Sequence, residues 1–442
     1  MDNEQKIVVG LDIGTTKICA LVGVKNQYGK LEILGMGQSV SEGVSRGKVL
    51  NIEKTVESIL KAVELASINA NIDIGVVNVG VAGHHIRCSR HHGTIIRQNA
   101  DSEISFNDVN RLNEDMYRIV VPPGEEIIHV VPQDYLIDGE SMVKDPVGFP
   151  GVKLEADFHI VTARTAEINN IKKCVKRSNL DSDALILEPI ASSMAVLSEE
   201  EKEAGVVLVD IGGGTTDVAV FYEGIIRHTA VIPFGGNIIS SDIKEGLQVM
   251  SAQAEKLKIQ FGMALPEHAK ENEIVSIPGI RNKEPKEISV KNLAHIIHAR
   301  IEEIIELVIA EIKASGYSNK LAAGIVITGG GSQLKYLSHL IELMSGMDVR
   351  IGFPNEHLGK SKVELVKSPQ YATAVGLVLA GFMAIDEREN AYRQQSLNSN
   401  VAKSVQKPKE KRETFGIGLL KSLPEKLNKF LVDDFDDKKD YR

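Results

Sequence analysis

The chain has 442 residues, 43% of them hydrophobic and 25% charged, which is typical of a soluble globular protein long enough for several domains. Its formal net charge of −9 argues against a general nucleic-acid-binding protein, so we expect no nucleic-acid partner. The three cysteines have no paired spacing, which suits a reducing compartment and predicts no cysteine metal site. The first residues lack a signal-peptide pattern, and no stretch approaches the roughly 18 apolar residues of a membrane-spanning helix.

The first predicted elements are three strands at residues 7–12, 18–24 and 31–38. The loop Gly14-Thr15-Thr16-Lys17 joins the first two strands, directly after Asp12. Threonine hydroxyls and the backbone N–H groups of a glycine turn suit phosphate oxygens, and Lys17 adds a positive charge. Taken alone, the loop is equally compatible with a plain hairpin that turns at a glycine.

A helix at residues 52–70 and a buried strand at 76–81 complete an α/β unit. The next segment, residues 84–163, changes character. It contains a polar helix and three apolar strands, predicted at residues 106–118, 127–131, 135–138 and 153–162. We expect a small α+β insertion. An insertion of this size on a nucleotide-binding body more often serves a partner than chemistry.

Two pairs of adjacent histidines open this insertion, namely His84 with His85 and His91 with His92. Adjacent side chains in a strand point to opposite faces, so neither pair readily shares one metal ion. We therefore favour solvated strand histidines over a metal cluster.

The α/β pattern returns with a helix at residues 165–177 and a short strand at 184–187. Glu188 follows that strand, and Pro189 suits the first turn of the next helix. If Glu188 faces a cleft, it can orient an attacking water. If it lies at the surface, it is a carboxylate favoured by the helix dipole. The sequence leaves both interpretations open.

The stretch at residues 206–221 predicts a strand, a tight turn and a second strand. Asp210 ends the first strand and can bind Mg²⁺ directly or through water beside the turn Gly212-Gly213-Gly214-Thr215-Thr216. The sequence Asp-Ile-Gly also occurs at Asp12, about 200 residues earlier. Two such phosphate loops predict duplicated halves that close on one nucleotide.

The next glycines, Gly235 and Gly236, open a helix that runs towards residue 247. On the helix after it, Glu255 and Lys258 lie three residues apart on one face. This pair either clasps a ribose and base or forms a surface ion pair worth a few tenths of a kcal/mol.

A third glycine-rich strand end closes the pattern. A strand at residues 322–328 leads into Gly329-Gly330-Gly331-Ser332, where close backbone approach suits an adenine and its ribose. Residues 369–384 predict a helix rich in small residues that can pack closely across the joint between the halves.

The C-terminal part has its own pattern. Residues 386–413 are polar, as in a flexible linker, and residues 414–442 predict an amphipathic helix at a membrane interface. The apolar side chains of that tail are Phe415, Leu419, Leu420, Leu423, Leu427, Phe430 and Leu431. Docking on the protein's own core or on a partner is the alternative. Residues 432–442 carry a net charge of −2, so we expect weak, reversible membrane binding that self-assembly strengthens.

The order of these motifs resembles that of the actin/Hsp70/sugar-kinase ATPase superfamily and, within it, the FtsA family. The resemblance covers about residues 5–385 and the general form of the tail. The motifs that carry it are Asp12-Ile-Gly14-Thr-Thr, Glu188-Pro-Ile-Ala-Ser192, Asp210-Ile-Gly-Gly-Gly-Thr215, Gly329-Gly-Gly-Ser332 and the alanine-containing helix after Pro369. Ser240-Ser241 before Asp242 and Phe149-Pro150 depart from the expected pattern and leave fine contacts open.

The resemblance implies an α/β, two-lobed actin-like ATPase fold with duplicated mixed-sheet subdomains, an FtsA-type α+β insertion and a C-terminal amphipathic helix. The implied first subdomain joins residues 1–84, 164–190 and 369–385, with the insertion at 85–163. The implied second subdomain joins 191–238 and 298–368, with an outer subdomain at 239–297. The linker is then 386–413 and the membrane tail 414–442.

The resemblance also implies roles in binding ATP and Mg²⁺. Asp12 and Asp210 would position Mg²⁺, and Glu188 with Asp210 would position water or metal. The two sides of the phosphates would face Gly14, Thr15, Thr16 and Lys17 and, opposite, Gly212, Gly213, Gly214, Thr215 and Thr216. The adenosine would be held by Gly235, Gly236, Glu255, Lys258, Gly330, Gly331 and Ser332.

The function implied is that of an ATP-binding cell-division protein, at most a weak ATPase, that self-assembles at the inner face of the cytoplasmic membrane. It would bind the FtsZ C-terminal peptide to tether the FtsZ ring and recruit later division proteins through residues 85–163. A pilus-assembly actin homologue is the nearest alternative, but we would not expect the amphipathic tail there. A small-molecule kinase of the superfamily needs a second-substrate pocket and a dedicated base.

Overall fold

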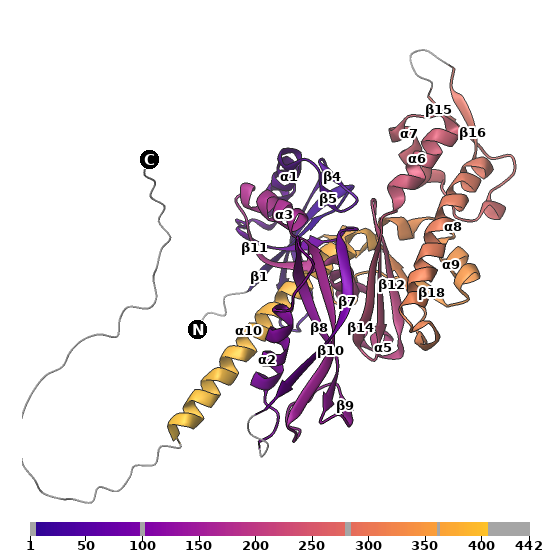
Figure 1. Ribbon diagram of the computed structural model, residues 1–442. Helices are drawn as coiled ribbons and strands as arrows, with labels where there is room; N and C mark the ends of the chain where they lie inside the picture. The colour runs from indigo at the N-terminus through magenta and orange to yellow at the C-terminus, as the bar shows by residue number, and fades with distance from the viewer. Residues whose placement is uncertain (1–5, 98–101, 279–283, 360–362, 405–442) are drawn as a thin grey trace, which may run out of the picture. The chain divides into compact units, whose positions relative to one another are not determined.

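The computed structural model describes residues 6–97, 102–278, 284–359 and 363–404 (Figure 1). Residues Met1–Glu387 form one compact unit, and the second unit is Arg388–Arg442. None of the helices in the described ranges is long and apolar enough to cross a membrane.

The first of two five-stranded sheets has the strand order β11-β6-β1-β2-β3. Its strands are β1 (Ile7–Ile13), β2 (Lys17–Lys25), β3 (Leu31–Val40), β6 (Val76–Val81) and β11 (Asp181–Leu187). The central strand β1 is antiparallel to β2 and parallel to β6. The four strands predicted before residue 82 are confirmed, each within two residues of the expected bounds.

The second sheet repeats this topology in the order β14-β13-β12-β17-β18. Its strands are β12 (Val206–Ile211), β13 (Thr216–Tyr222), β14 (Ile225–Ile232), β17 (Ile325–Thr328) and β18 (Val349–Ile351). Here β12 is antiparallel to β13 and parallel to β17, as β1 is to β2 and β6. The predicted duplication is therefore confirmed in the strand pairing.

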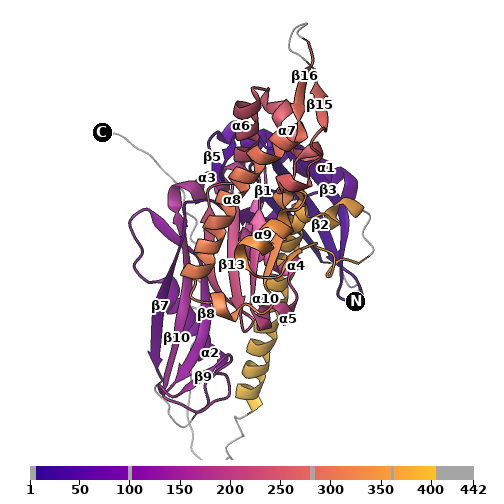
Figure 2. The ribbon, with the colours of Figure 1, turned by 90° about the vertical axis from the view of Figure 1, so that its right-hand side faces the viewer.

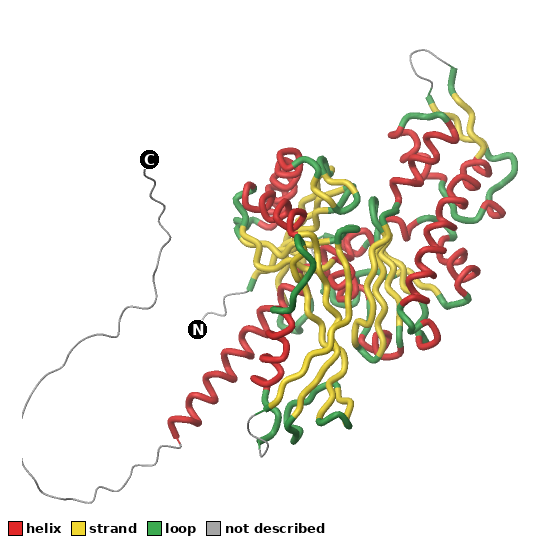
Figure 3. The backbone as a smooth tube through the Cα atoms, in the orientation of Figure 1, coloured by secondary structure: helices red, strands yellow, loops and turns green. Residues whose placement is uncertain are grey.

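Helices cover both sheets, as the tube view in Figure 3 shows. α1 (Ile52–Ala70) and α3 (Thr165–Arg177) share one core with the first sheet. The other face of that sheet shares a core with the second sheet, α4 (Glu188–Val196) and α10 (Ala372–Ser404). Small elements complete this part, namely β4 (Val44–Ser45), β5 (Lys48–Val49) and α5 (Glu199–Ala204). The joint between the duplicated halves is thus a packed apolar core.

The outer face of the second sheet carries its own helices. They are α6 (Gly236–Leu247), α7 (Ser251–Phe261), α8 (Val290–Ala314) and α9 (Leu337–Ser345), which share one core with that sheet. A two-stranded hairpin of β15 (Ile274–Ile277) and β16 (Lys286–Ser289) lies between α7 and α8 in the chain.

The inserted segment forms a separate four-stranded sheet with one helix, clearly visible in Figure 2. It consists of β7 (Ile86–Ile96), α2 (Phe106–Tyr117), β8 (Glu125–Ile137), β9 (Ser141–Val143) and β10 (Lys153–Arg164). The two strands predicted at 127–131 and 135–138 are wrong as separate elements, because β8 is continuous. Pro132 is tolerated within it because β9 pairs only with residues 135–137, so among the described strands β8 has no second neighbour at Pro132.

The prediction of solvated strand histidines is wrong for two of the four residues, since His84 and His85 are not in a strand and His85 is not solvated. His84 and His85 precede β7 in a turn, and His85 is only 1% exposed. Neither ring nitrogen of His85 has a hydrogen-bond partner, and burial lowers its pKa to about 4. The chain therefore buries this imidazole as a neutral group at the root of the insertion.

The last helix is longer than predicted. α10 runs to Ser404, although the sequence predicted a helix to residue 384 and a flexible linker from 386. Between Phe382 and Ser404 the chain has neither glycine nor proline, and the next proline is Pro408. Polar composition was misleading here because a polar segment without helix breakers can continue an existing helix. The predicted tail at 414–442 lies outside the described residues.

Candidate functional site

The first predicted phosphate loop is the turn of a tight hairpin. β1 and β2 pair up to Ile13 and Ile18, which leaves residues 14–17 to make the turn. Asp12 is buried at the end of β1. The Lys17 Nζ donates to the Gln370 carbonyl at 2.5 Å and lies 3.6 Å from the centre of the Tyr371 ring. Lys17 therefore links this loop to the segment that leads into α10.

The second loop has the same construction. β12 and β13 pair up to Ile211 and Thr216, and the Gly212 N–H donates to the Thr215 carbonyl at 2.9 Å. The Thr216 hydroxyl donates to the Phe234 carbonyl at 2.8 Å, which ties the loop to the segment before α6. Each half of the fold thus presents a glycine- and threonine-containing turn at the end of its central strand.

The two turns meet face to face. A Cβ on Gly213 would lie 1.9 Å from the Thr16 Oγ1, and a Cβ on Gly214 would lie 2.5 Å from the Thr15 Oγ1. Only glycine permits so close an approach, because any side chain would overlap the opposite threonine. Predicted phosphate-binding residues from opposite halves of the chain are therefore brought together.

Four carboxylates gather beneath these turns. Asp12, Asp210 and Asp217 are all less than 8% exposed, and Glu188 is half-buried at the start of α4. Burial raises the pKa of Glu188 well above its usual value, and the charges of Asp12, Asp217 and Asp210 raise it further. Glu188 therefore faces the carboxylate cluster, and the alternative of a surface carboxylate does not describe it.

Burial is also the largest cause of the raised pKa of the three aspartates. It raises the pKa of Asp12 to about 6, against the opposing charge of Lys17. The pKa of Asp210 is raised by burial in spite of hydrogen bonds from Ser192 and Thr373. Such a cluster favours a cation, because a positive charge between the carboxylates relieves both their desolvation and their repulsion.

Asp217 belongs to this cluster and was missed in the sequence. It pairs directly with Asp210 across the hairpin, and burial together with the Asp210 charge raises its pKa well above 3.8. Its Oδ1 is buried without a hydrogen-bond partner, while its Oδ2 accepts from the Thr215 hydroxyl at 3.3 Å. One signal was available in the sequence, namely an acidic residue inside an otherwise apolar strand.

The donor set fits magnesium bound together with phosphate. In the described part of the chain, no three acidic, histidine or cysteine side chains converge to hold an ion by themselves. Mg²⁺ usually takes one or two carboxylates and completes its shell with water and substrate phosphates. The unpartnered Asp217 carboxylate oxygen, next to Asp210 in this cluster, is the type of oxygen atom that such an ion attracts.

The residues predicted to hold adenosine lie on adjoining turns. The Gly236 N–H donates to the Gly212 carbonyl at 2.9 Å, and Gly235 packs on the same carbonyl. The Lys258 Nζ donates to the Gly236 carbonyl at 2.8 Å and to Glu255 at 2.9 Å. Ser240 joins the group through hydrogen bonds with both side chains of that pair. The Glu255–Lys258 pair is therefore tied to the turn before α6.

In the third glycine turn, one glycine meets open space and the next two residues are packed against the protein. A Cβ on Gly330 would meet nothing within 4 Å, whereas one on Gly331 would overlap Ile211 at 2.3 Å. The Ser332 hydroxyl is buried and donates to the Gly329 carbonyl at 2.8 Å, within its own turn. Open space for a ligand is thus found at Gly330, while Gly331 and Ser332 hold the turn against β12.

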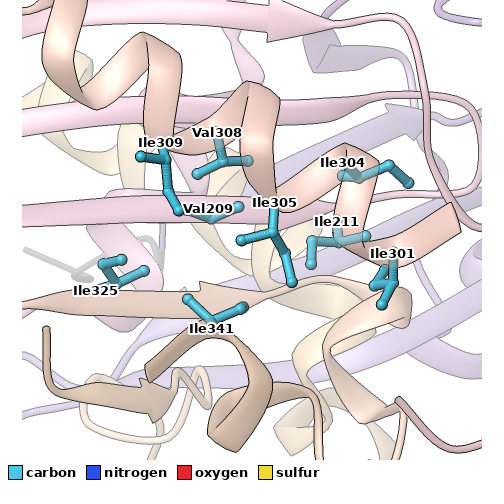
Figure 4. Close-up of a pocket in the computed structure, with 9 residues that line it drawn as sticks. All are labelled: Val209, Ile211, Ile301, Ile304, Ile305, Val308, Ile309, Ile325 and Ile341. Carbon is cyan, nitrogen blue, oxygen red and sulfur yellow. The ribbon is translucent and has the colours of Figure 1, made fainter. Parts of the chain in front are cut away.

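The apolar cavity shown in Figure 4 is separate from these turns. Its volume is about 10 Å³, roughly the space of a single water. Its lining consists of nine aliphatic residues, Val209, Ile211, Ile301, Ile304, Ile305, Val308, Ile309, Ile325 and Ile341. It is a packing defect between α8, α9 and the second sheet and offers no polar group to a ligand.

Two family models match separate parts of the chain. The family model described as "Cell division protein FtsA" matches residues 207–376, and that described as "SHS2 domain inserted in FTSA" matches residues 83–162. The cell division protein FtsA of Pseudomonas aeruginosa is 42% identical over 376 residues, which cover 85% of this chain and 89% of that protein. That of Escherichia coli (strain K12) is 36% identical over 385 residues, covering 86% and 91%.

Two solved structures show the likeness of fold. The PilM-PilN type IV pilus biogenesis complex matches with a TM-score of 0.60 at 15% identity, covering 85% of this chain and 98% of that chain. MreB5 of Spiroplasma citri bound to ADP matches with a TM-score of 0.53 at 14% identity, covering 87% and 99%. At such low identities the likeness shows the fold alone.

Proposed function

The chain belongs to the FtsA family of cell division proteins, and we propose that it is an ATP-binding, actin-like protein that self-assembles and tethers the FtsZ ring at the inner face of the cytoplasmic membrane. The observation that carries the nucleotide site is the contact of two glycine–threonine turns, one from each duplicated half, above a cluster of buried carboxylates. Catalysis is secondary in this proposal, with at most a weak ATPase.

In this proposal Asp12 and Asp210 hold Mg²⁺ directly or through water, and Asp217 adds negative charge beside Asp210. Bound Mg²⁺ would offset the negative charge of the phosphates and of the carboxylates. The turns at residues 14–17 and 212–216 supply backbone N–H groups and hydroxyls to the phosphates. The turns at Gly235–Gly236 and Gly330, with Glu255 and Lys258, hold the adenosine. Glu188 orients a water, which its place beside the aspartates supports.

The remaining roles fall on other parts of the chain. We assign contacts with later division proteins to the insertion at residues 85–163, and membrane attachment to the tail at 414–442. The tail's apolar residues, including Leu427, Phe430 and Leu431, would enter the lipid interface. We assign filament and partner contacts to this insertion and to the outer subdomain at 239–297.

The alternative functions are less well supported. The pilus-complex structure shares the fold at 15% identity, whereas relatives at 34–42% identity are cell division proteins. A small-molecule kinase would need a carboxylate reserved as a base for a second substrate. The four carboxylates of the site lie in one cluster, and a bound cation would explain why they lie together.

Two measurements test the proposal. Binding of a fluorescent ATP analogue with Mg²⁺ is expected for the full chain and is expected to weaken strongly in Asp210→Asn. Electron microscopy on lipid monolayers is expected to show filaments with ATP, and none when residues 414–442 are deleted. Absence of ATP binding would overturn the nucleotide site. Filaments that form on lipid equally well without the tail would overturn the membrane role.

A further inference from the structure

Two buried hydroxyls hold the carboxylate of Asp210. The Ser192 Oγ, on α4, donates to the Asp210 Oδ2 at 2.6 Å. The Thr373 Oγ1, in the first turn of α10, donates to the same oxygen at 3.2 Å, and the two hydroxyls are 3.0 Å apart. Ser192 is fully buried and Thr373 is 9% exposed. We call this pair the hydroxyl clamp.

The other carboxylate oxygen is confined by backbone. A Cβ on Gly329 would lie 2.3 Å from the Asp210 Oδ1, so the third glycine turn closes that side without a side chain. With Oδ2 held by two hydroxyls and Oδ1 bounded by Gly329, the carboxylate has one orientation available. A fixed orientation matters for Mg²⁺, which demands near-ideal octahedral geometry.

The segment that supplies Thr373 contacts all three glycine-rich strand ends. The Gln370 carbonyl accepts from Lys17 of the first loop at 2.5 Å, and Thr373 reaches Asp210 of the second. The Pro369 carbonyl accepts from the Gly329 N–H at 3.3 Å at the third turn. A shift of residues 369–373, which lead into α10, would therefore change contacts with all three strand ends.

We propose that Ser192 and Thr373 are positioning residues for the Asp210 carboxylate, and that through Thr373 the start of α10 sets how strongly the nucleotide site depends on Mg²⁺. This inference rests on the proposed nucleotide-binding function. Coupling between two sites is reciprocal. A cation bound by Asp210 would therefore also stabilise the position of α10 in which Thr373 donates to Asp210.

The test compares the affinity of the full chain for a fluorescent ATP analogue in Mg²⁺ with its affinity in EDTA. Thr373→Val keeps the shape of the side chain but removes its hydroxyl, and Thr373→Ser keeps the hydroxyl. Ser192→Ala removes the other donor. Its matched control is Ser193→Ala, since Ser193 is equally buried but donates to the Ile190 carbonyl at 2.7 Å.

We expect Thr373→Val and Ser192→Ala to lower the gain in affinity from Mg²⁺ by about tenfold, the effect of losing one hydrogen bond to a charged group. Affinity in EDTA is expected to change little. Thr373→Ser and Ser193→Ala are expected to keep the wild-type ratio. A general loss of structure would instead lower affinity in both conditions, so the ratio separates positioning from stability.

A second readout is hydrogen exchange of the backbone amides at residues 370–380. Addition of Mg²⁺ and ATP is expected to slow exchange in the wild-type chain and to have little effect in Thr373→Val. If Ser192→Ala fails to fold, the comparison of Thr373→Val with Thr373→Ser still tests whether the Thr373 hydroxyl affects the gain in affinity from Mg²⁺. The role of the hydroxyl clamp would be overturned if Thr373→Val kept the wild-type ratio of affinity in Mg²⁺ to affinity in EDTA. It would also be overturned if Ser193→Ala lowered that ratio as much as Ser192→Ala does. Neither result would affect the proposed nucleotide-binding function. A wild-type chain that binds no ATP would overturn the proposed function and the clamp with it.

Discussion

Stability and nucleotide binding make opposite demands on Asp217. Its carboxylate is 3% exposed, and one of its oxygens has no hydrogen-bond partner. Burial, with the neighbouring Asp210 charge, raises its pKa well above 3.8. A carboxyl whose pKa is raised in the folded state lowers stability once the pH exceeds the unfolded value, and the full cost applies above the folded pKa. Asp217→Asn removes this cost with little change of shape.

The direction of the effect follows from the shift. Because folding raises the pKa of the Asp217 carboxyl, Asp217→Asn is expected to raise the free energy of unfolding at pH 8. The asparagine still offers an oxygen to the Thr215 hydroxyl. At pH 5 the gain is expected to be smaller than at pH 8, because the raised pKa lets the wild-type carboxyl take up a proton more readily in the folded chain than in the unfolded chain. Loss of a carboxylate is expected to weaken Mg²⁺-dependent ATP binding by about tenfold.

The assay is urea unfolding of the full chain at pH 8 and pH 5 without nucleotide, followed by titration with a fluorescent ATP analogue in Mg²⁺. The control is Asp73→Asn, which also removes one carboxylate charge, but from an exposed loop that precedes β6. The reasoning is refuted if Asp217→Asn lowers the free energy of unfolding at pH 8, or if Asp73→Asn produces the same gain.

Two further substitutions test the packing of the turns and the joint with the insertion. In Gly213→Ala the new Cβ, 1.9 Å from the Thr16 Oγ1, must retreat by about 1.5 Å to reach the 3.4 Å of ordinary contact. We expect a loss of about 1–3 kcal/mol in thermal or urea unfolding and weaker ATP binding, while Gly75→Ala, which meets open space, keeps wild-type stability. The His159 ring lies 3.0 Å from the Thr229 hydroxyl, and burial lowers its pKa to about 4. Because the unfolded chain takes up this proton at a higher pH than the folded chain does, stability falls as the pH drops from about 6.5 towards 4. Unfolding measured at pH 7 and pH 5 is expected to show a smaller loss for His159→Gln than for the wild type, and an unchanged loss would contradict the assignment.

Much of the fold followed from local patterns in the sequence. Apolar runs that end at glycines predicted the central strands β1 and β12, and the repeated Asp-Ile-Gly predicted that the two halves share a topology. Errors arose where long-range pairing overrides a local signal. Two separate strands were predicted at 127–131 and 135–138, but β8 continues through Pro132, because its neighbour β9 pairs only with residues 135–137. The polar residues after 385 were expected to form a linker, yet nothing in them stops α10 before Ser404.

The site could be predicted only in part, for a geometric reason. Its glycine turns are visible because each is continuous in sequence. The hydroxyls on Asp210 come from Ser192 and from Thr373, which are 18 and 163 residues away from it in the chain. A serine or threonine within a helix carries no periodicity that identifies its partner, so only the packed structure shows this contact. Asp217 was missed but could have been predicted, because counting residues across the predicted hairpin places it opposite Asp210.

The small residues predicted to close the joint also explain how the clamp forms. A Cβ on Gly376 would lie 1.8 Å from the Ala191 carbonyl, so α10 and α4 touch through their backbones. Gly10 allows the same closeness between β1 and α10, where a Cβ would lie 2.9 Å from the Ala374 carbonyl. Helices separated by larger side chains would hold the two hydroxyls too far apart to share one carboxylate oxygen. The tight packing of the joint is therefore a condition for the chemistry at Asp210, which makes the start of α10 part of the site.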